Sequence, residues 1–362
     1  MNMDKVWVGT RKGLFVVKKD GSGWSLGQPT FPGEPVTQVL VNPHDGAWYV
    51  ALRLGHFGIK MHKSTDQGAN WKEIAAPAFP PKPEAGPMKD DPTPWTVDLI
   101  WALAAGPGEL WAGCLPAGLF RSRDGGASWQ LVESLWNRPE RQQWFGGGYD
   151  HAGIHSILVD PRDAKHVTVA VSCGGVWQTH DGGETWEVTS KGMVADYMPP
   201  ERKEDPIIQD PHSMTMCAAH PDVLWVQHHA GMYRSANGGL QWDRIDAPSP
   251  SAFGFAVAAH PTDPMRAWFA PAKADANRVA VDGKLVVNET RDGGKSYIAH
   301  GKGLPERDAY HLIYRHALDV SRDGKGLAMA STTGGLWVSE DEGVSWTCVS
   351  RDLPPVAAVR CG

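Results

Sequence analysis

Short runs of alternating apolar and polar residues follow one another along the whole chain, and polar turns separate them. One group of four runs lies at 97–105, 109–114, 118–122 and 129–132. The same succession recurs over 154–189. Side chains on a strand point alternately to its two faces, so runs of this length predict half-buried β-strands. Each group therefore predicts four consecutive strands joined by short turns.

Every group also contains the pattern S/T-x-D-x-G-x-x-W between its third and fourth runs. Ser64 to Trp71 is the first full copy, five further copies follow, and a shorter copy lies at 19–24. The closing aromatic residues are at positions 24, 71, 129, 186, 242, 297 and 346. Glycine accepts the positive φ of a tight hairpin, and an aspartate can bind backbone N–H groups of its own turn. These repeated turn residues, Asn237 in one copy and aspartates in the other six, are expected to build the fold and not to catalyse a reaction.

The repeated motif resembles the Asp box of the sialidase-like, BNR-repeat β-propeller superfamily. Four antiparallel strands repeated seven times predict an all-β fold, a seven-bladed β-propeller. The chain begins with a strand at 6–10 and ends with an apolar run at 355–360 that no motif follows. We therefore expect the C-terminal strand to join the first blade and close the ring, within a single domain over residues 1–362.

The connections opposite the hairpins are long, and this difference locates the expected site. The four longest are 76–94, 134–153, 190–211 and 300–314. Long loops cost closure entropy and usually have a role, so we expect a binding or active site on the long-loop face. Most of the 15 histidines lie on that face or at the ends of strands that border it.

Histidine can ligate a metal or move a proton near neutral pH, and both roles are open here. We expect one divalent metal ion, with the ligands His155, His212 and His316, and no organic cofactor. The alternative for any one of these histidines is a hydrogen-bonded position in the core or at the rim.

The remaining candidates are side chains suited to acid–base chemistry or to binding a polar substrate. The candidate catalytic residues are Asp150, His151, His155, Tyr310 and His311. The candidate substrate-binding residues are Arg11, Arg53, His56, Trp95, Asp98, Trp144, His228 and His229. Arginine can bind a carboxylate with two hydrogen bonds or form a surface ion pair. The loop aromatic residues, which also include Trp136 and Phe145, can stack on a sugar or pack the loops down.

Composition excludes several classes of function. The 362 residues carry 35 basic and 41 acidic side chains, a net charge of −6, which argues against nucleic-acid binding. No apolar run approaches the roughly 18 residues of a membrane helix. The N-terminus lacks a hydrophobic signal core, so we expect a cytoplasmic protein. Five widely spaced cysteines without a CxxC pair argue against a zinc knuckle. Homo-oligomerisation stays open.

The sialidase arginine triad begins with an Arg-Ile-Pro motif, and this tripeptide does not occur in the chain. Sialidase activity is therefore not expected. We expect a hydrolase or lyase that acts on a small polar or carbohydrate-like substrate at a His-rich, metal-binding mouth opposite the hairpins. The alternative is a non-catalytic propeller that binds a protein or glycan through its long-loop face, because this fold does not determine function.

Overall fold

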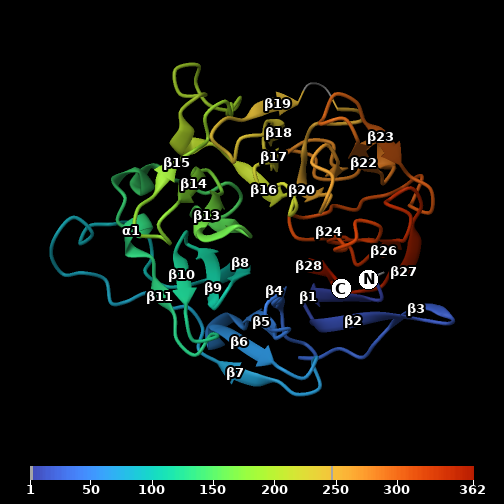
Figure 1. Cartoon of the computed structure of the whole chain (residues 1–362), viewed down its shortest axis with the longest axis horizontal. Coiled ribbons are helices and arrows are strands. Elements are labelled where there is room, and N and C mark those ends of the chain that lie inside the picture. Colours follow the sequence, from blue (N-terminus) through green and yellow to red (C-terminus); the bar gives the residue numbers. More distant parts are fainter. Residues whose placement is uncertain (1–2, 246–247) are drawn as a thin grey trace. The chain divides into compact units, whose positions relative to one another are not determined.

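A computed structural model describes residues 3–245 and 248–362 of the chain. The strands form seven four-stranded antiparallel sheets (Figure 1), which confirms the predicted all-β seven-bladed propeller fold. The chain divides into two compact units, which we call unit 1 (Met1–Val36 with His212–Gly362) and unit 2 (Thr37–Pro211). The predicted single domain over 1–362 stays a prediction.

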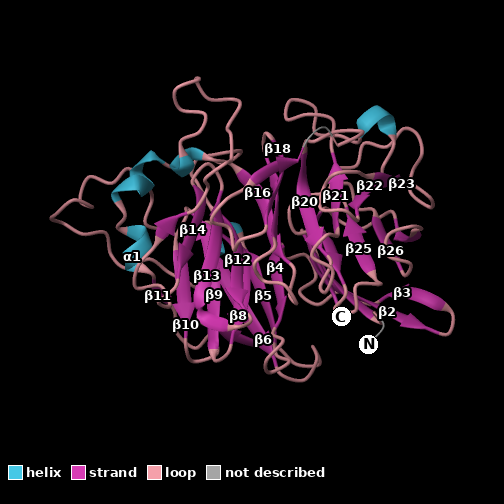
Figure 2. Cartoon of the chain, turned by 45° about the horizontal axis from the view of Figure 1, so that its top comes forward, coloured by secondary structure: helices cyan, strands magenta, loops and turns pink. Residues whose placement is uncertain are grey.

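The sheets of unit 2 follow one another in chain order. Their strands are β4 (Val36–Val41), β5 (Trp48–Arg53), β6 (Ile59–Ser64), β7 (Lys72–Ile74), β8 (Leu99–Gly106), β9 (Glu109–Leu115), β10 (Leu119–Ser122), β11 (Gln130–Leu131), β12 (Ile154–Asp160), β13 (Asp163–Val171), β14 (Gly175–Thr179) and β15 (Glu187–Val188). Helical turns are confined to the connections, as Figure 2 shows in cyan. In this unit they are η1 (Gly55–Phe57), α1 (Glu133–Trp136), η2 (Pro139–Gln143) and η3 (Pro206–Ile208).

The sheets of unit 1 come from both ends of the chain. Their strands are β1 (Lys5–Thr10), β2 (Gly13–Asp20), β3 (Gly23–Leu26), β16 (Pro211–Met216), β17 (Leu224–His228), β18 (Gly231–Ser235), β19 (Asp243–Ile245), β20 (Gly254–Ala259), β21 (Ala267–Pro271), β22 (Val287–Thr290), β23 (Ile298–His300), β24 (Leu318–Val320), β25 (Leu327–Ala330), β26 (Leu336–Ser339), β27 (Thr347–Ser350) and β28 (Val356–Cys361). One helical turn, η4 (Val281–Gly283), lies between β21 and β22. None of the helices in the described part of the chain is long and apolar enough to cross a membrane.

The C-terminal strand completes the first sheet. Strand β28 pairs antiparallel with β1, from Val6 opposite Cys361 to Thr10 opposite Val356 (Figure 1). The sheet order is β28-β1-β2-β3, which confirms the predicted closure by the C-terminal strand. Strand β1 is thereby paired on both sides, which leaves it no open edge.

The repeated motif forms the same hairpin in each of its six full copies. In one of them the Asp181 carboxylate accepts hydrogen bonds from the Thr179 hydroxyl and from the backbone and hydroxyl of Thr185. The corresponding hydroxyl–carboxylate or hydroxyl–amide pairs are Ser64–Asp66, Ser122–Asp124, Ser235–Asn237, Thr290–Asp292 and Ser339–Asp341. The bonds from Thr185 hold the pKa of Asp181 well below its usual value. These carboxylates are engaged within their own turns, as a structural role requires.

Large aromatic side chains fill the space between neighbouring sheets within each unit. Trp111 and Trp177 are fully buried in one cluster of unit 2, and Trp268 and Trp337 are buried in one cluster of unit 1. Buried apolar area is the main stabilising term of such a core. The strands are thus fixed by packing, and the long connections are left to form the surface.

Candidate functional site

A solvent-open pocket in unit 2 lies between two long connections. Its hollow measures about 50 Å³ and opens to solvent. Its lining residues are Thr93, Ala117, Trp136, Arg141, Trp144, Phe145, Asp150, His151 and Ala152. Seven of these nine residues come from the connection between β11 and β12. The pocket therefore brings together five residues that the sequence proposed for a site, namely Trp136, Trp144, Phe145, Asp150 and His151.

Two short helical turns hold the aromatic wall of the pocket in place. Helix α1 ends at Trp136, and Pro139 begins η2, where its fixed φ favours a helical start. The turn η2 closes when the Trp144 N–H donates to the Arg141 carbonyl over 3.0 Å. Trp136 is fully buried, whereas Phe145 is 37% exposed. Phe145 and the half-buried Trp144 thus face the pocket, and Trp136 is closed to solvent.

A buried ion pair joins the two connections behind the pocket. The Nη2 atom of Arg141 lies 2.6 Å from Oδ2 of Asp91, and the two side chains are 3% and 1% exposed. Arg141 also donates to the Thr93 hydroxyl and to the Trp136 carbonyl. Burial raises the pKa of Asp91, but the bonds from Arg141 and Thr93 outweigh it and leave that pKa below its ordinary value. The pair therefore stays ionised, and its net charge is zero.

The loop that carries the acid–base candidates is packed closely against the neighbouring sheet. An added Cβ on Gly147 would lie 2.8 Å from the sulfur of Cys173 and 2.8 Å from the hydroxyl of Ser172. The Phe145 N–H donates to the Cys173 carbonyl. Glycine is therefore required where this loop approaches the sheet. Asp150 is exposed and His151 is half-buried, as expected of groups that meet a ligand.

The other candidates of unit 2 do not line the pocket. The Nη2 atom of Arg53 lies 2.7 Å from Oδ1 and 2.8 Å from Oδ2 of Asp98, so these two candidates bind each other. His56 is exposed, and its ring lies 4.0 Å from that of Phe57. Trp95 lies behind the pocket and donates to the Asp91 carboxylate over 3.2 Å.

The three predicted metal ligands fall in different surroundings. In unit 2, both ring nitrogens of His155 are hydrogen-bonded, Nδ1 with the Ser156 hydroxyl and Nε2 with the Pro211 carbonyl. In unit 1, His212 is buried, and its Nδ1 lies 2.7 Å from the Gly254 carbonyl. The backbone of His316 pairs with the C-terminal strand. The metal site stays a prediction.

Two histidines of unit 1 come close enough to share a ligand. The rings of His212 and His229 lie 5.3 Å apart in an edge-to-face arrangement, with Phe253 against both. A metal held by this pair would need further ligands. The neighbouring His228 is buried, and its Nδ1 accepts the Ala230 N–H.

The remaining candidates of unit 1 differ in exposure. Tyr310 is 69% exposed. His311 is half-buried, its Nδ1 lies 3.0 Å from the Ser331 hydroxyl and 2.6 Å from that of Thr333, and burial lowers its pKa. Arg11 is exposed. The structure thus gathers Asp150, His151 and Trp144, and it leaves the roles of all the candidates as predictions.

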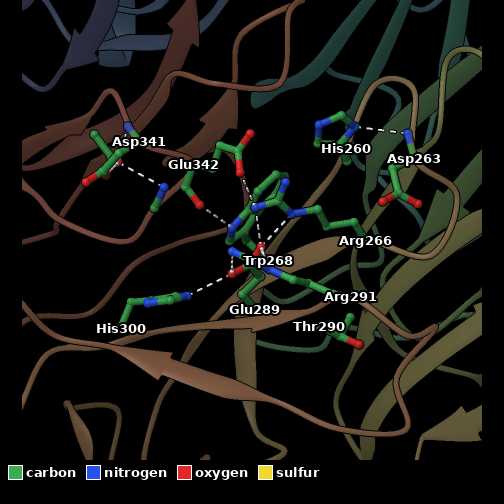
Figure 3. A network of polar contacts seen from close by, with 12 residues as sticks. His260, Asp263, Arg266, Trp268, Glu289, Thr290, Arg291, His300, Asp341 and Glu342 are labelled. Carbon is green, nitrogen blue, oxygen red and sulfur yellow. Dashed lines mark hydrogen bonds and ion pairs between the residues drawn. The ribbon is translucent and has the colours of Figure 1, made fainter.

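A second buried carboxylate lies in unit 1, in a network of cations (Figure 3). Glu289 is fully buried, and Arg266, Arg291 and His300 all point toward its carboxylate. Arg266 also pairs with Glu342 of the next repeat hairpin over 2.8 Å. Every oxygen of Glu289 is engaged by protein, so this network fixes the fold and offers no open site.

Sequence reasoning missed Arg141, Asp91 and Thr93. These residues meet only through long-range loop contacts, and Arg141 and Asp91 are 50 positions apart in the chain. A signal was nevertheless present, because Arg141 stands between two loop tryptophans, Trp136 and Trp144, in the connection that supplies most of the pocket.

No family model matches the chain. The oligoxyloglucan-reducing end-specific xyloglucanase of Emericella nidulans is 31% identical over 143 residues, which cover 39% of this chain and 15% of that enzyme. The chain therefore matches only a small part of this curated relative.

Solved structures share the fold at low sequence identity. An ancestral GH74 enzyme superposes with a TM-score of 0.58 and 16% identity over 99% of this chain and 40% of that chain. YCF48 bound to D1 peptide superposes with a TM-score of 0.51 and 12% identity over 86% of this chain and 80% of that chain. These likenesses support the propeller fold alone.

Proposed function

We propose that the protein is a carbohydrate-active propeller enzyme, a glycoside hydrolase that binds a glycan in the pocket of unit 2. The observation that carries this proposal is the pocket itself, in which ring surface from Trp144 and Phe145 adjoins Asp150 and His151. Sugar rings stack on aromatic side chains through their C–H faces, and a few polar groups fix their orientation. The local identity to a xyloglucanase supports a β-glucan as the substrate.

The acid–base groups suit hydrolysis of a glycosidic bond. A hydrolase must protonate the leaving oxygen and remove a proton from the attacking water. His151 in its protonated form can supply the first proton, and the exposed Asp150 carboxylate can accept the second. Water thereby adds across the bond, and each sugar leaves with a hydroxyl group.

One observation favours a second function, glycan binding without cleavage. Most glycoside hydrolases use two carboxyl groups. Among the described residues that line the pocket, Asp150 is the one carboxylate. The similarity to YCF48 bound to D1 peptide shows that a solved propeller of this fold carries a bound peptide. Stacking in the pocket is common to both functions, and only the chemical step separates them.

The test is the release of reducing ends from xyloglucan oligosaccharides and cello-oligosaccharides. The enzyme account predicts release by the wild type and at least about a hundredfold loss in Asp150→Asn and His151→Ala, the scale of general acid–base catalysis. Asp45→Asn alters a turn carboxylate outside the pocket and is the matched control. Binding without release by the wild type selects the second function, and absence of both binding and release contradicts the two proposals.

A further inference from the structure

Two histidines lie side by side at one end of strands β13 and β14 in unit 2, whose positions Figure 1 shows. His166 belongs to β13, and His180 directly follows β14. Val167 pairs with Thr179, so the antiparallel register places the two histidines opposite one another, with their side chains on the same face of the sheet. The positions of both residues are therefore set by the strand pairing.

The two imidazole rings are stacked. Their centres lie 4.2 Å apart, and their planes are inclined by 24°. His180 is exposed, whereas the side chain of His166 is 17% exposed. Two nitrogens that bind one ion at about 2.1 Å in tetrahedral geometry lie about 3.4 Å apart. A turn of the exposed His180 ring toward His166 is therefore sufficient to bring both residues to one ion.

A buried carboxylate orients the ring of His166. Oδ2 of Asp160 lies 3.2 Å from Nδ1 of His166, and the Asp160 side chain is 6% exposed. Burial raises the pKa of Asp160, but the hydrogen bonds from Arg162 and His166 outweigh it and hold that pKa at about 2. The ionised carboxylate only accepts hydrogen bonds, so Nδ1 of His166 is the donor, and in the neutral ring Nε2 carries the lone pair. Histidines that ligate metals commonly have their other ring nitrogen held in this way.

The second ring nitrogen of His166 has no partner within the protein. Its Nε2 atom is closed to solvent, and it makes no hydrogen bond with any of the described residues. A buried polar atom without a partner costs free energy, and such atoms are uncommon in folded proteins. A metal ion would supply the missing partner of this lone pair. His155 offers no such atom, because both of its ring nitrogens are hydrogen-bonded.

We propose that His166 and His180 form a binding site for a divalent transition-metal ion, in which Asp160 positions His166. Nε2 of His166 is one ligand, and a ring nitrogen of His180 is the second. Imidazole ligands suit Cu²⁺, Zn²⁺ and Ni²⁺, whereas Mg²⁺ prefers oxygen, and two protein ligands leave coordination positions open to water. None of the three residues lines the pocket, so the site is separate from the proposed function. It also differs from the ligand set that the sequence predicts.

The test is a calorimetric titration of the full chain with Cu²⁺ in the presence of glycine, a weak chelator that competes with scattered surface histidines. We expect the wild type to bind the ion and His166→Ala and His180→Ala each to lower the affinity at least tenfold. Asp160→Asn should lower it about 10- to 100-fold, the scale found for residues that orient a metal ligand. His44→Ala removes another exposed histidine of unit 2 and should leave the affinity unchanged.

A spectroscopic measurement needs no variant. Pulsed electron paramagnetic resonance of the wild type with less than one equivalent of Cu²⁺ should show two coordinated imidazole nitrogens. The signal of a single imidazole, or a wild type that binds no Cu²⁺, overturns the proposal. Binding of Mg²⁺ with the same affinity as Cu²⁺ also contradicts it.

The deciding variant is His180→Ala, because it changes an exposed side chain and should keep the native fold. Near-UV circular dichroism identifies any variant that has lost that fold. An unchanged Cu²⁺ affinity in folded His180→Ala shows that the ion binds elsewhere and that our assignment is wrong. Glycan binding does not enter this test, so the metal site and the proposed function stand or fall separately.

Discussion

The guanidinium of Arg141 lies 3.9 Å from the ring centre of Trp136, and the two side chains form one wall of the pocket. Cation–π contacts are strongest where water is excluded, as it is around these two buried groups. Both residues lie in the connection between β11 and β12, so a change that disturbs this contact should also change the pocket wall.

The first prediction concerns the stability that Trp136 provides. Trp136→Ala removes a buried ring that packs against Phe79, Trp95 and Arg141, and should lower the free energy of unfolding by about 3–5 kcal/mol. Phe57→Ala changes an aromatic residue that is 70% exposed and should stay within about 0.5 kcal/mol. Urea unfolding followed by circular dichroism measures both. Equal losses of unfolding free energy in the two variants would contradict a stabilising role for the packing around Trp136.

The second prediction concerns the buried charge network of unit 1. Burial alone raises the pKa of Glu289, but its bonds with His300, Arg291 and Arg266 outweigh burial and lower the pKa from 4.5 to about 2. A depressed folded-state pKa stabilises the protein above pH 4.5, and this stability is lost as the pH falls toward 2. A shift of this size corresponds to about 3 kcal/mol.

Glu289→Gln tests that network through its pH dependence. At pH 7 the variant should be about 3 kcal/mol less stable than the wild type, and the difference should shrink toward pH 2. Glu306→Gln, at an exposed position, serves as the control. The quantity to measure is the free energy of unfolding in urea at several pH values. A difference that does not change with pH would contradict the assigned pKa.

The third prediction concerns the repeat hairpins. Gly126 has a φ of +91°, and an added Cβ would lie 2.7 Å from Cδ1 of Ile74. Gly46 has a φ of +73° with no atom near the added Cβ. Gly46→Ala should cost about 1 kcal/mol from backbone strain, and Gly126→Ala should cost more because of the collision. Thermal unfolding ranks the two variants, and the reverse order would contradict the hairpin packing.

The sequence predicts the fold well because the fold is repetitive and local. The spacing of the closing aromatic residues, from Trp71 to Trp346, predicts the repeated four-stranded sheets. The apolar run at 355–360, which no motif follows, predicts the strand that closes the first sheet. Both depend on alternation and on turn chemistry, which act over a few residues. The structure confirms them strand by strand, with shifts of one or two residues at strand ends such as β8.

The pocket is only partly predictable from sequence. Trp144, Asp150 and His151 are close in the chain, so a single loop could be expected to bring them together. The pairing of Arg141 with Asp91, and of Arg53 with Asp98, depends on which loops meet in space. No periodicity encodes such contacts, because irregular connections are ordered by packing and by individual hydrogen bonds.

Binding of a neutral cello- or xyloglucan oligosaccharide to the wild type and to Trp144→Ala, measured by calorimetry, tests the central claim most directly. Trp144 lines the pocket and is only half-buried, so its ring is available for stacking. The account predicts binding by the wild type and about a tenfold or greater loss in Trp144→Ala, the scale of one aromatic stacking contact. Unchanged affinity in Trp144→Ala, or a wild type that binds neither oligosaccharide, would contradict a glycan site in this pocket.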